Sequence, residues 1–466
     1  MRPQGPRSAH PRLDTPRPAY AWYVLAVLTL AYMSSFIDRM ILNLLVDPIR
    51  RDMQISDTQM SLLMGFSFAV FYTLFGLPLG RWADSGNRRR IIVAGIVVWS
   101  AMTAACGLVK SYGQFLLARV GVGVGEAALS PAAYSMIGDY FPKERLALAM
   151  SVYALGVYLG NGLALLLGGL SVHLAGVREV WTLPLVGTIF PWQMVFFIVG
   201  IPGVLVALLM LTVREPVRRG VAGNASASFA SVKAYVKANA RTFVCHNCGF
   251  ALLTLAAFAF VAWMPTCLMR KFGLTVVQAA VALGVCMTLF ATLGSLVGGW
   301  MADRHAERRT PGARMRVGLI AAVGLVPWMA IFPLMPSAAW AIAVLAPAAF
   351  CLGLPYGAAV AAIQDVTPPR MRGQLSALYL FAINLIGLGI GPTAVALLTD
   401  YVFRDDLAVP YSVSITTVLA AAAAAVLFRS SFAAYDRSVE YAARWSDAAA
   451  HPAPTGGPVS MRGQTA

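Results

Sequence analysis

Charged residues are scarce in this chain: they make up 12% of its 466 residues, whereas hydrophobic residues make up 59%. A soluble globular domain carries about 25% charged residues, because its surface has to face water. Half that fraction over so long a chain means that most of the surface faces another medium. The composition therefore excludes an ordinary soluble protein and favours one that is embedded in lipid.

Cysteines are also few, and they lie almost entirely within apolar stretches, as small buried hydrophobic residues do. Such a placement excludes a disulfide framework. Cys245 and Cys248 have the spacing of one half of a zinc site, but no second pair of ligands follows them. We therefore expect neither a metal ion nor another cofactor.

Acidic residues are outnumbered by basic ones, with 20 Asp and Glu against 36 Lys and Arg, which gives a formal net charge of +16. A strongly basic chain can bind nucleic acid. Here, however, the basic residues lie in short clusters between long apolar runs, which is the pattern of membrane topology. The charge distribution therefore excludes nucleic acid as a partner.

The chain also lacks the sequence motifs of zinc proteases, serine hydrolases and ATP-driven pumps. The glycine-rich string Gly121-Val-Gly-Val-Gly125 lies inside an apolar stretch, where small residues let helices approach closely. A dinucleotide-binding loop instead follows a strand and opens a helix. We therefore expect no enzymatic activity.

Twelve stretches are apolar and long enough to cross a bilayer as helices, which takes about 20 residues each. The first six are predicted at 21–46, 59–82, 91–109, 112–138, 145–172 and 192–213. The last six are predicted at 243–268, 275–302, 317–335, 338–364, 375–398 and 411–428. The predicted fold class is therefore an all-α polytopic membrane protein.

Lysines and arginines outside these spans gather on the side that holds both termini, and the positive-inside rule places that side in the cytosol. The longest cytosolic connection, 214–241, separates a six-helix lobe at 21–213 from another at 242–432. Within this linker, the stretch 232–240 has the pattern of a short amphipathic helix at the membrane surface. We expect a disordered cytosolic tail at 1–20 and a second cytosolic tail at 433–466.

Two charged motifs recur at matching places in the two halves. Gly80-Arg-Trp-Ala-Asp84 follows the second span and Gly299-Trp-Met-Ala-Asp303 follows the eighth, while Asp139 and Asp365 directly follow the fourth and tenth. Parallel six-span repeats are a known transporter architecture, with the substrate site near the membrane midplane. The residues of this predicted cytosolic gate are Gly80, Asp84, Arg88, Arg89, Asp139, Arg145, Gly299, Asp303, Arg304, Arg308, Asp365 and Arg372.

With these motifs the chain resembles the major facilitator superfamily over nearly its whole length. The string from Gly80 to Arg90 is similar to the superfamily signature GxxxDRxGRR and departs from it at Ser85 and Asn87, while the copy at Gly299 keeps Arg304. The resemblance implies twelve helices in two pseudo-symmetric six-helix lobes that transport by alternating access. It also implies that the gate charges form a network that stabilises the outward-facing state.

Three further strings resemble the Spinster family, which includes animal exporters of sphingosine-1-phosphate and lysophospholipids and their bacterial homologues. They are Phe36-Ile-Asp-Arg39, Arg119-Val-Gly-Val-Gly-Val-Gly-Glu126, and Asn384-Leu-Ile-Gly-Leu-Gly-Ile-Gly-Pro392. This resemblance implies a proton-coupled transporter in a bacterial inner membrane. We expect it to act as a monomer.

Four ionisable residues lie deep within the predicted spans, and all belong to the first half: Asp38, Arg39, Arg119 and Glu126. A charge at the centre of a membrane helix costs about 2.5–3.5 kcal/mol on insertion scales, so such residues face a cavity and pair. Arg119 and Glu126 are two helical turns apart and therefore share one face of their span. Asp38 and Arg119 lie at similar depths. The second half contributes no deep ionisable residue to this set.

We predict that Asp38 and Glu126 bind and release protons, with Arg39 and Arg119 as switching partners or as anchors for an anionic substrate. Burial favours the neutral carboxylic acid, whereas a nearby guanidinium favours the carboxylate. A change in their separation during transport would therefore move protons. The alternative is a static ion pair between Asp38 and Arg119 that only fixes helix packing.

Aromatic and neutral polar side chains are predicted to line a substrate cavity that is charged on one side and apolar on the other. Such a cavity suits an amphipathic substrate with an anionic or zwitterionic headgroup. Taken singly, each of these aromatics more often packs in a core or faces lipid. The predicted cavity residues are Phe68, Tyr72, Tyr153, Tyr158, Trp263, Met264, Tyr356, Tyr379, Phe381 and Asn384.

Three functions fit these patterns. The leading hypothesis is proton-coupled transport of a lipid-like or amphipathic organic molecule by exchange or export. The second is uptake of a small organic anion such as a sugar acid, whose carboxylate Arg39 and Arg119 would bind. The third, from another functional class, is a non-transporting receptor that binds its ligand on the same fold.

Overall fold

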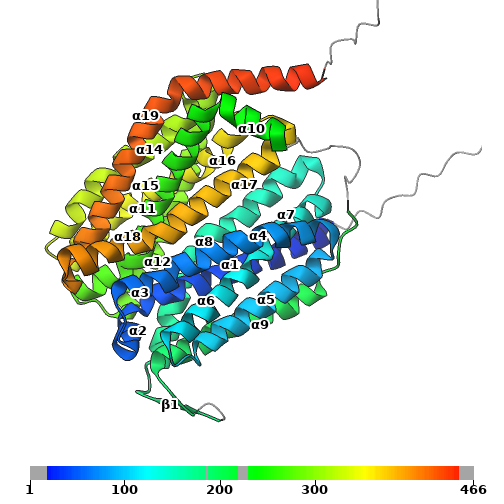
Figure 1. Ribbon diagram of the computed structural model, residues 1–466. Helices are drawn as coiled ribbons and strands as arrows, with labels where there is room; N and C mark the ends of the chain where they lie inside the picture. The colour runs from blue at the N-terminus through cyan, green and yellow to red at the C-terminus, as the bar shows by residue number, and fades with distance from the viewer. Residues whose placement is uncertain (1–17, 185–186, 219–228, 451–466) are drawn as a thin grey trace, which may run out of the picture. The chain divides into compact units, whose positions relative to one another are not determined.

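Helices form almost all of the structure, a computed structural model that describes residues 18–184, 187–218 and 229–450 (Figure 1). Among these residues, twelve helical segments are long and apolar enough to cross a membrane. The predicted all-α fold with twelve spans is therefore confirmed. Residues 1–17 and 451–466 of the expected tails, and 219–228 of the expected linker, lie outside the described residues.

The first half of the chain begins with α1 at Pro18, inside the expected tail, and contains nine α-helices, a π-helix and a two-stranded antiparallel hairpin that pairs Trp181 with Ile189. The elements are α1 (Pro18–Leu44), α2 (Val46–Met53), α3 (Asp57–Ser61), η1 (Leu62–Phe66), α4 (Ser67–Ser85), α5 (Arg88–Cys106), α6 (Tyr112–Ala127), α7 (Leu129–Tyr140), α8 (Lys143–Ala175), β1 (Trp181–Leu183), β2 (Gly187–Ile189) and α9 (Pro191–Thr212).

The second half is helical throughout its described residues, and its last helix continues well beyond residue 428, where the last span was expected to end. The elements are α10 (Phe229–Ala238), α11 (Ala240–Phe272), α12 (Val276–Cys286), η2 (Met287–Ala291), α13 (Thr292–Glu307), α14 (Ala313–Ile331), η3 (Phe332–Leu334), α15 (Ala338–Gly353), α16 (Pro355–Asp365), η4 (Pro369–Met371), α17 (Arg372–Ala382), η5 (Ile383–Ile390), α18 (Gly391–Leu397), η6 (Leu398–Phe403), η7 (Asp406–Ala408) and α19 (Val409–Ala450).

Polar caps and a glycine mark several helix ends. Ser56 and Thr275 each form a capping box with a glutamine three residues on, which satisfies backbone amides that have no partner within the helix. The side chain of Asn87 caps the start of α5. Gly273 ends α11 in the left-handed region, with a φ of 68°.

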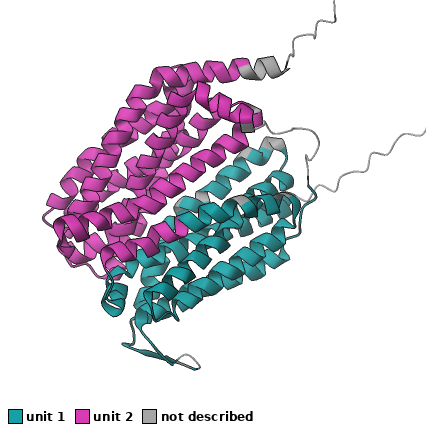
Figure 2. Ribbon diagram, viewed as in Figure 1, with its two compact units in different colours: residues 1–55, 70–221 teal, residues 56–69, 222–466 magenta. Residues whose placement is uncertain are grey.

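Contacts divide the chain into two compact units (Figure 2). Unit 1 comprises residues 1–55 and 70–221, and unit 2 comprises residues 56–69 and 222–466. Within unit 1, α1 packs along α8, and α5 packs against α6 and α9. Within unit 2, α19 packs along α11 and α14. In each unit, long helices therefore pack against one another along their lengths.

Glycines allow helices within each unit to pack at backbone contact. In unit 1, a Cβ at Gly95 would lie 2.7 Å from the carbonyl oxygen of Gly125. In unit 2, a Cβ at Gly298 would overlap the carbonyl oxygen of Leu354. Small residues at such contacts bring helix backbones together, because lipid supplies no hydrophobic force that drives helices to associate.

The segment 56–69 precedes most of the first-half spans in sequence but packs with unit 2. The Arg270 guanidinium donates two hydrogen bonds to the Asp57 carboxylate, at 2.8 and 2.9 Å. The backbone amide and hydroxyl of Thr58 donate to Asp400 at 2.7 and 2.6 Å. A Cβ at Gly65 would overlap the carbonyl oxygen of Leu388. The segment is therefore bound by charge, by hydrogen bonds and by close backbone packing.

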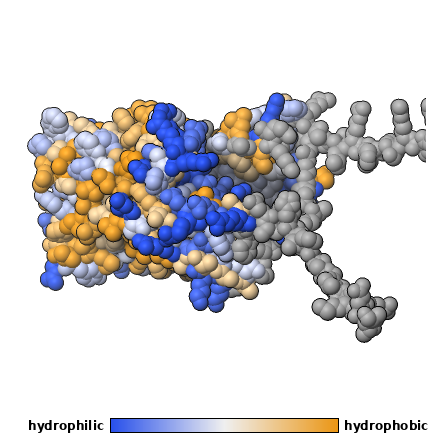
Figure 3. Space-filling model, turned by 90° about the horizontal axis from the view of Figure 1, so that it is seen from above, coloured by the Kyte–Doolittle hydropathy of each residue, from blue (hydrophilic) through white to orange (hydrophobic). Residues whose placement is uncertain are grey.

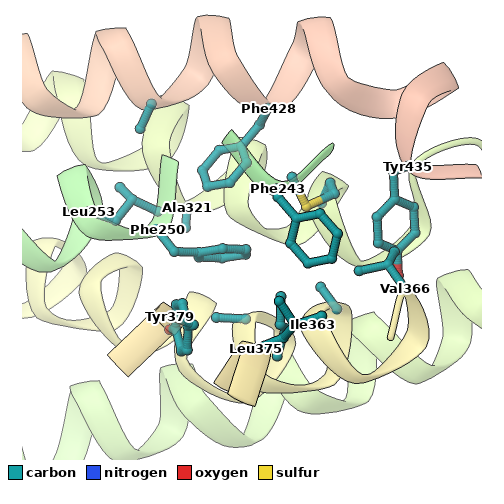
Figure 4. Close-up of a cluster of buried hydrophobic side chains, with 14 of the residues drawn as sticks. Phe243, Phe250, Leu253, Ala321, Ile363, Val366, Leu375, Tyr379, Phe428 and Tyr435 are labelled. Carbon is teal, nitrogen blue, oxygen red and sulfur yellow. The ribbon is translucent and has the colours of Figure 1, made fainter. Parts of the chain in front are cut away.

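Aromatic rings fill the core of unit 2 between α11, α16, α17 and α19 (Figure 4). Phe250 and Phe428 face one another with ring centroids 4.7 Å apart. Tyr379 is almost completely buried in the same cluster. Aromatic pairs of this kind stabilise a protein by about 0.5–1.5 kcal/mol beyond their buried area.

On the face that Figure 3 shows, hydrophobic residues cover broad areas, and the most hydrophilic ones gather between them. Leu117 in α6 is 71% exposed, and Val426 in α19 is 68% exposed. Water-soluble monomers rarely expose apolar side chains over such areas. The distribution fits helices whose outer faces contact lipid.

Candidate functional site: a buried ion pair in unit 1

Arg39 and Glu126 form an ion pair between α1 and α6. The Arg39 Nε and Nη2 atoms lie 2.7 and 2.6 Å from Glu126 Oε2. The Glu126 side chain is completely buried, whereas 11% of the Arg39 side chain is exposed. The other carboxylate oxygen, Oε1, has no hydrogen-bond partner among the described residues. The arginine therefore holds the acid through one oxygen and retains some access to the surroundings.

Asp38 and Arg119 lie beside this pair, and each residue is only 1% exposed. Arg119 Nη1 donates to the backbone carbonyl oxygen of Asp38 at 3.2 Å. Within the described chain, Asp38 Oδ1 accepts no hydrogen bond. A buried carboxylate oxygen without a donor is costly unless the group takes up a proton. The arrangement therefore gives unit 1 two buried carboxyl groups, each with one oxygen that accepts no hydrogen bond from the described residues.

Aromatic rings surround the ion pair. The Arg39 guanidinium lies 5.1 Å from the centre of the Phe36 ring and 5.2 Å from that of Tyr72. Tyr32 stacks on Tyr153 with centroids 4.8 Å apart. Ring faces attract cations and also contact apolar groups. The site therefore combines an arginine whose side chain is slightly exposed with an aromatic wall.

The four deep ionisable residues meet in unit 1, but their pairing differs from the simplest expectation. Spacing along one helix places Glu126 near Arg119, whereas the structure pairs it with Arg39 of α1. Arg119 and Glu126 both lie in α6, which ends directly after Glu126, at Ala127, before α7 begins at Leu129. A contact between helices has determined the partner of Glu126, and spacing along α6 alone does not reveal it.

The predicted cavity residues fall into three groups. Tyr72 and Tyr153 belong to unit 1 and lie at the ion pair or its aromatic wall. Trp263 is fully buried and donates to the Pro392 carbonyl oxygen at 2.8 Å, a packing role within unit 2. The remaining residues of unit 2 are buried (Phe68, Met264, Tyr379), exposed (Tyr356, Phe381) or intermediate (Asn384), and the side chain of Tyr158 lies outside the described set.

His246 is a buried ionisable residue of unit 2 that was not predicted as a site residue. It lies within the candidate span Ala240–Phe272 and is fully buried. Its Nε2 donates to the Ala359 carbonyl oxygen at 2.9 Å, and its ring lies 5.1 Å from that of Tyr379. In the sequence, His246 lies near the start of an apolar span, and an exposed residue at a helix end has the same pattern.

A charge network in unit 1 is centred on Arg88, the first residue of α5. Its Nε donates to Glu215 Oε1 at 2.7 Å, and its Nη1 donates to Ser135 Oγ at 2.9 Å and to the Asp139 carboxylate. Its Nη2 donates to the Pro216 carbonyl oxygen at 3.0 Å. Arg88 and Asp139 therefore meet, and Glu215, which the repeat did not indicate, completes the network.

A comparable network in unit 2 is centred on Arg314, near the start of α14. Arg314 Nε lies 2.5 Å from Asp365 Oδ2, and its Nη1 lies 3.6 Å from Asp303 Oδ1. The hydroxyl of Tyr435 also donates to Asp365, at 2.8 Å. In each unit, therefore, the arginine that follows the loop binds the acid at the end of a later span. Arg314 was missed because it lies beyond the repeated string.

The other predicted gate residues contribute less to these networks. The backbone amide of Arg89 donates to Glu215, Arg304 stacks over Trp300, and Arg372 donates to the Thr367 carbonyl oxygen. The side chain of Asp84 lies outside the described set. Gly80 and Gly299 leave room for a Cβ. Arg145 and Arg308 are exposed.

The family model of the Major Facilitator Superfamily matches residues 28–392. The chain belongs to the Major Facilitator Superfamily. It is therefore a transporter and a multi-pass integral membrane protein, as its twelve candidate spans predict.

Solved structures and curated relatives refine this placement. The crystal structure of a bacterial homologue of the human lysosomal transporter Spinster matches with a TM-score of 0.74 and 28% identity, over 92% of this chain and 99% of that one. An efflux pump of Mycolicibacterium smegmatis is 28% identical over 84% of this chain and 88% of its own. The hexuronate transporter of Bacillus subtilis is 25% identical over 81% and 87%. The predicted Spinster resemblance of this superfamily member is confirmed.

Proposed function

We propose that this transporter couples the movement of a lipid-like or amphipathic organic molecule to the movement of protons. The observation that supports the proposal is the buried ion pair between Arg39 and Glu126, with the Asp38 carboxyl group beside it. Ionisable groups within membrane spans are costly to bury, and they commonly mark ion and substrate pathways.

The proton step involves the carboxylate of Glu126. Protonation removes its negative charge and weakens its charge-assisted hydrogen bonds with Arg39. The Arg39 guanidinium then binds the anionic headgroup of a substrate. When the substrate leaves, Arg39 returns to Glu126 and favours release of the proton. Proton binding and headgroup binding are thereby linked through one arginine, with Asp38 as the second carboxyl group.

The aromatic wall favours a substrate with an apolar part. Tyr153 is fully buried, and its ring stacks on Tyr32 and packs against Tyr134, whose centroid is 5.3 Å away. Rings beside charged side chains suit an amphipathic molecule better than a uniformly polar one. The Spinster resemblance and the efflux-pump relative support the same substrate class and an export or exchange direction.

Proton movement driven by substrate tests this function. Purified protein is reconstituted in liposomes that contain a pH-sensitive dye, and a lysophospholipid is supplied on one side. The proposal predicts proton movement with the unsubstituted protein, its loss with Glu126→Gln, and its retention with Glu179→Gln, which removes an exposed acid of the same unit. Normal proton movement with Glu126→Gln would contradict the role given to this residue.

A second candidate is uptake of a small organic anion, and the similarity to a hexuronate transporter favours it. In that case Arg39 and Arg119 bind the substrate carboxylate, and no long apolar contact is needed. The same liposomes separate the two candidates when a hexuronate replaces the lysophospholipid. Flux of the hexuronate without flux of the lysophospholipid would favour the small organic anion as the substrate. Binding of either compound without flux would indicate a receptor.

The positive-inside distribution supports a bacterial inner membrane with both termini in the cytosol. Labelling of a cysteine introduced at Ala230 in α10 tests this orientation in intact cells. The proposal predicts labelling by a membrane-permeant maleimide and protection from an impermeant one. Equal labelling by both would place α10 on the outer side.

A further inference from the structure

Three arginines from different helices of unit 2 meet at one turn of α19. Arg241, at the start of α11, donates to the Ser430 carbonyl oxygen at 2.9 Å. The guanidinium groups of Arg316 in α14 and Arg429 in α19 lie 5.3 and 5.7 Å from the centre of the Phe432 ring. We call Arg241, Arg316 and Arg429 the arginine cluster.

The arginine cluster has no acidic partner among the described residues. Arg316 donates instead to the Pro311 carbonyl oxygen, at 3.3 Å. Two acids follow Phe432 in α19: Asp436, one turn on, accepts from the backbone amide of Gly312, and Glu440 pairs with Arg444. Carbonyl oxygens and a ring position the three charges without neutralising them. A cluster of this kind attracts an anion.

Exposed valines lie one helical turn farther into the spans than two of these arginines. Val244 is 56% exposed and follows Arg241 by three residues, and Val426 is 68% exposed and precedes Arg429 by three. Residues three apart lie on the same side of a helix. Arg241 and Arg429 therefore each have an apolar, exposed neighbour within a candidate membrane span, where acyl chains contact the protein.

We propose that the arginine cluster binds the phosphate group of an anionic phospholipid. Guanidinium groups bind phosphate oxygens through pairs of hydrogen bonds, and basic clusters at the ends of membrane helices attract anionic lipids. The acyl chains of such a lipid would lie along Val244 and Val426, which a soluble phosphate would leave uncovered. This site is separate from the ion pair of unit 1 and does not depend on proton coupling.

The bound lipid would anchor α19 at the point where it passes from the membrane to the surface. Beyond Phe432, α19 continues over α10 (Figure 1), and the rings of Tyr235 and Tyr441 lie 5.5 Å apart. The Tyr235 hydroxyl donates to the Val366 carbonyl oxygen at 2.8 Å, and burial raises the pKa of this phenol. The lipid therefore stabilises a turn that leads directly into a packed cytosolic extension.

Native mass spectrometry of the purified protein tests the proposal. Phosphatidylglycerol and phosphatidylcholine with the same acyl chains are titrated separately into the unsubstituted protein and into Arg241→Gln/Arg429→Gln. The proposal predicts that the unsubstituted protein prefers phosphatidylglycerol and that the double variant binds it at least about tenfold more weakly. The control Lys110→Gln/Arg404→Gln removes two positive charges outside the cluster and is expected to bind normally.

Two further measurements keep the result interpretable. Arg241→Lys/Arg429→Lys keeps both charges, so it is expected to fold and to retain part of the preference even if the glutamine variant is unstable. Inorganic phosphate is expected not to displace the lipid. Equal binding by the double glutamine variant, equal loss in the charge control, no residual preference in the lysine variant, or displacement by inorganic phosphate would each overturn the proposal.

Discussion

The two units differ in where their buried polar side chains lie. Unit 1 buries Asp38, Arg119 and Glu126 in the middle of its spans and pairs Glu126 across helices. Unit 2 has a core cluster of aromatic and apolar side chains with His246 buried against it, and its buried ion pair, Asp57 with Arg270, lies at helix ends. Under the proposed function, the proton step therefore belongs to unit 1, because the buried carboxyl groups of Asp38 and Glu126 lie there.

The largest effect is expected from Arg39→Gln. Removal of one partner from a buried ion pair costs about 3–5 kcal/mol, because the other charge is left uncompensated. We expect substrate flux in liposomes to fall to the background level. In unit 2, His246→Gln keeps a donor for the Ala359 carbonyl oxygen and is expected to retain proton-coupled flux. Loss of coupling in the histidine variant with normal coupling in the arginine variant would reverse the assignment of the units.

The next effect concerns the two charge networks. Arg88 is fully buried and hydrogen-bonds to four residues, whereas 18% of the Arg314 side chain is exposed. Each hydrogen bond to a charged group contributes about 1.5–3 kcal/mol, and exposure reduces this value. Arg88→Gln is therefore expected to lower the unfolding temperature in detergent more than Arg314→Gln does. Thermal unfolding monitored by fluorescence measures both, and the opposite order would contradict the comparison.

A smaller effect is expected from helix packing inside unit 2. A Cβ at Gly298 overlaps the Leu354 carbonyl oxygen, whereas a Cβ at the neighbouring Gly299 meets no atom within 4 Å. Overpacking of a well-packed site costs about 1–3 kcal/mol. Gly298→Ala is therefore expected to lower the unfolding temperature, while Gly299→Ala leaves it nearly unchanged. Equal stability of the two variants would show that α13 can move away from its neighbour at little cost.

Much of the fold was predictable, because each bilayer-spanning helix needs a long apolar segment and interrupting polar residues end it. The extension of α19 to Ala450 was not predicted. Its polar residues resemble those of a tail, and its helix is stabilised by tertiary contacts such as the hydrogen bond between Thr242 and Ser438. The grouping of 56–69 with unit 2 was also missed, since it depends on contacts with residues more than two hundred positions away.

The site was predictable in membership and less so in pairing. Apolar surroundings identified Asp38, Arg39, Arg119 and Glu126, because a charge is conspicuous there. Spacing along one helix could not show that Arg39 reaches Glu126 from another helix. Partners in connecting segments, such as Glu215, carry no local signal, since acidic residues are common in loops.

The central claim is that Glu126 and the substrate headgroup compete for Arg39. The most direct test measures the affinity of the purified protein for an anionic lysophospholipid as a function of pH. Binding that displaces Glu126 from Arg39 takes up a proton, so affinity is expected to rise as pH falls, by up to about tenfold per pH unit for one proton. Glu126→Gln is expected to bind with little dependence on pH. A pH-independent affinity of the unsubstituted protein, or the same pH dependence in Glu126→Gln, would contradict the account.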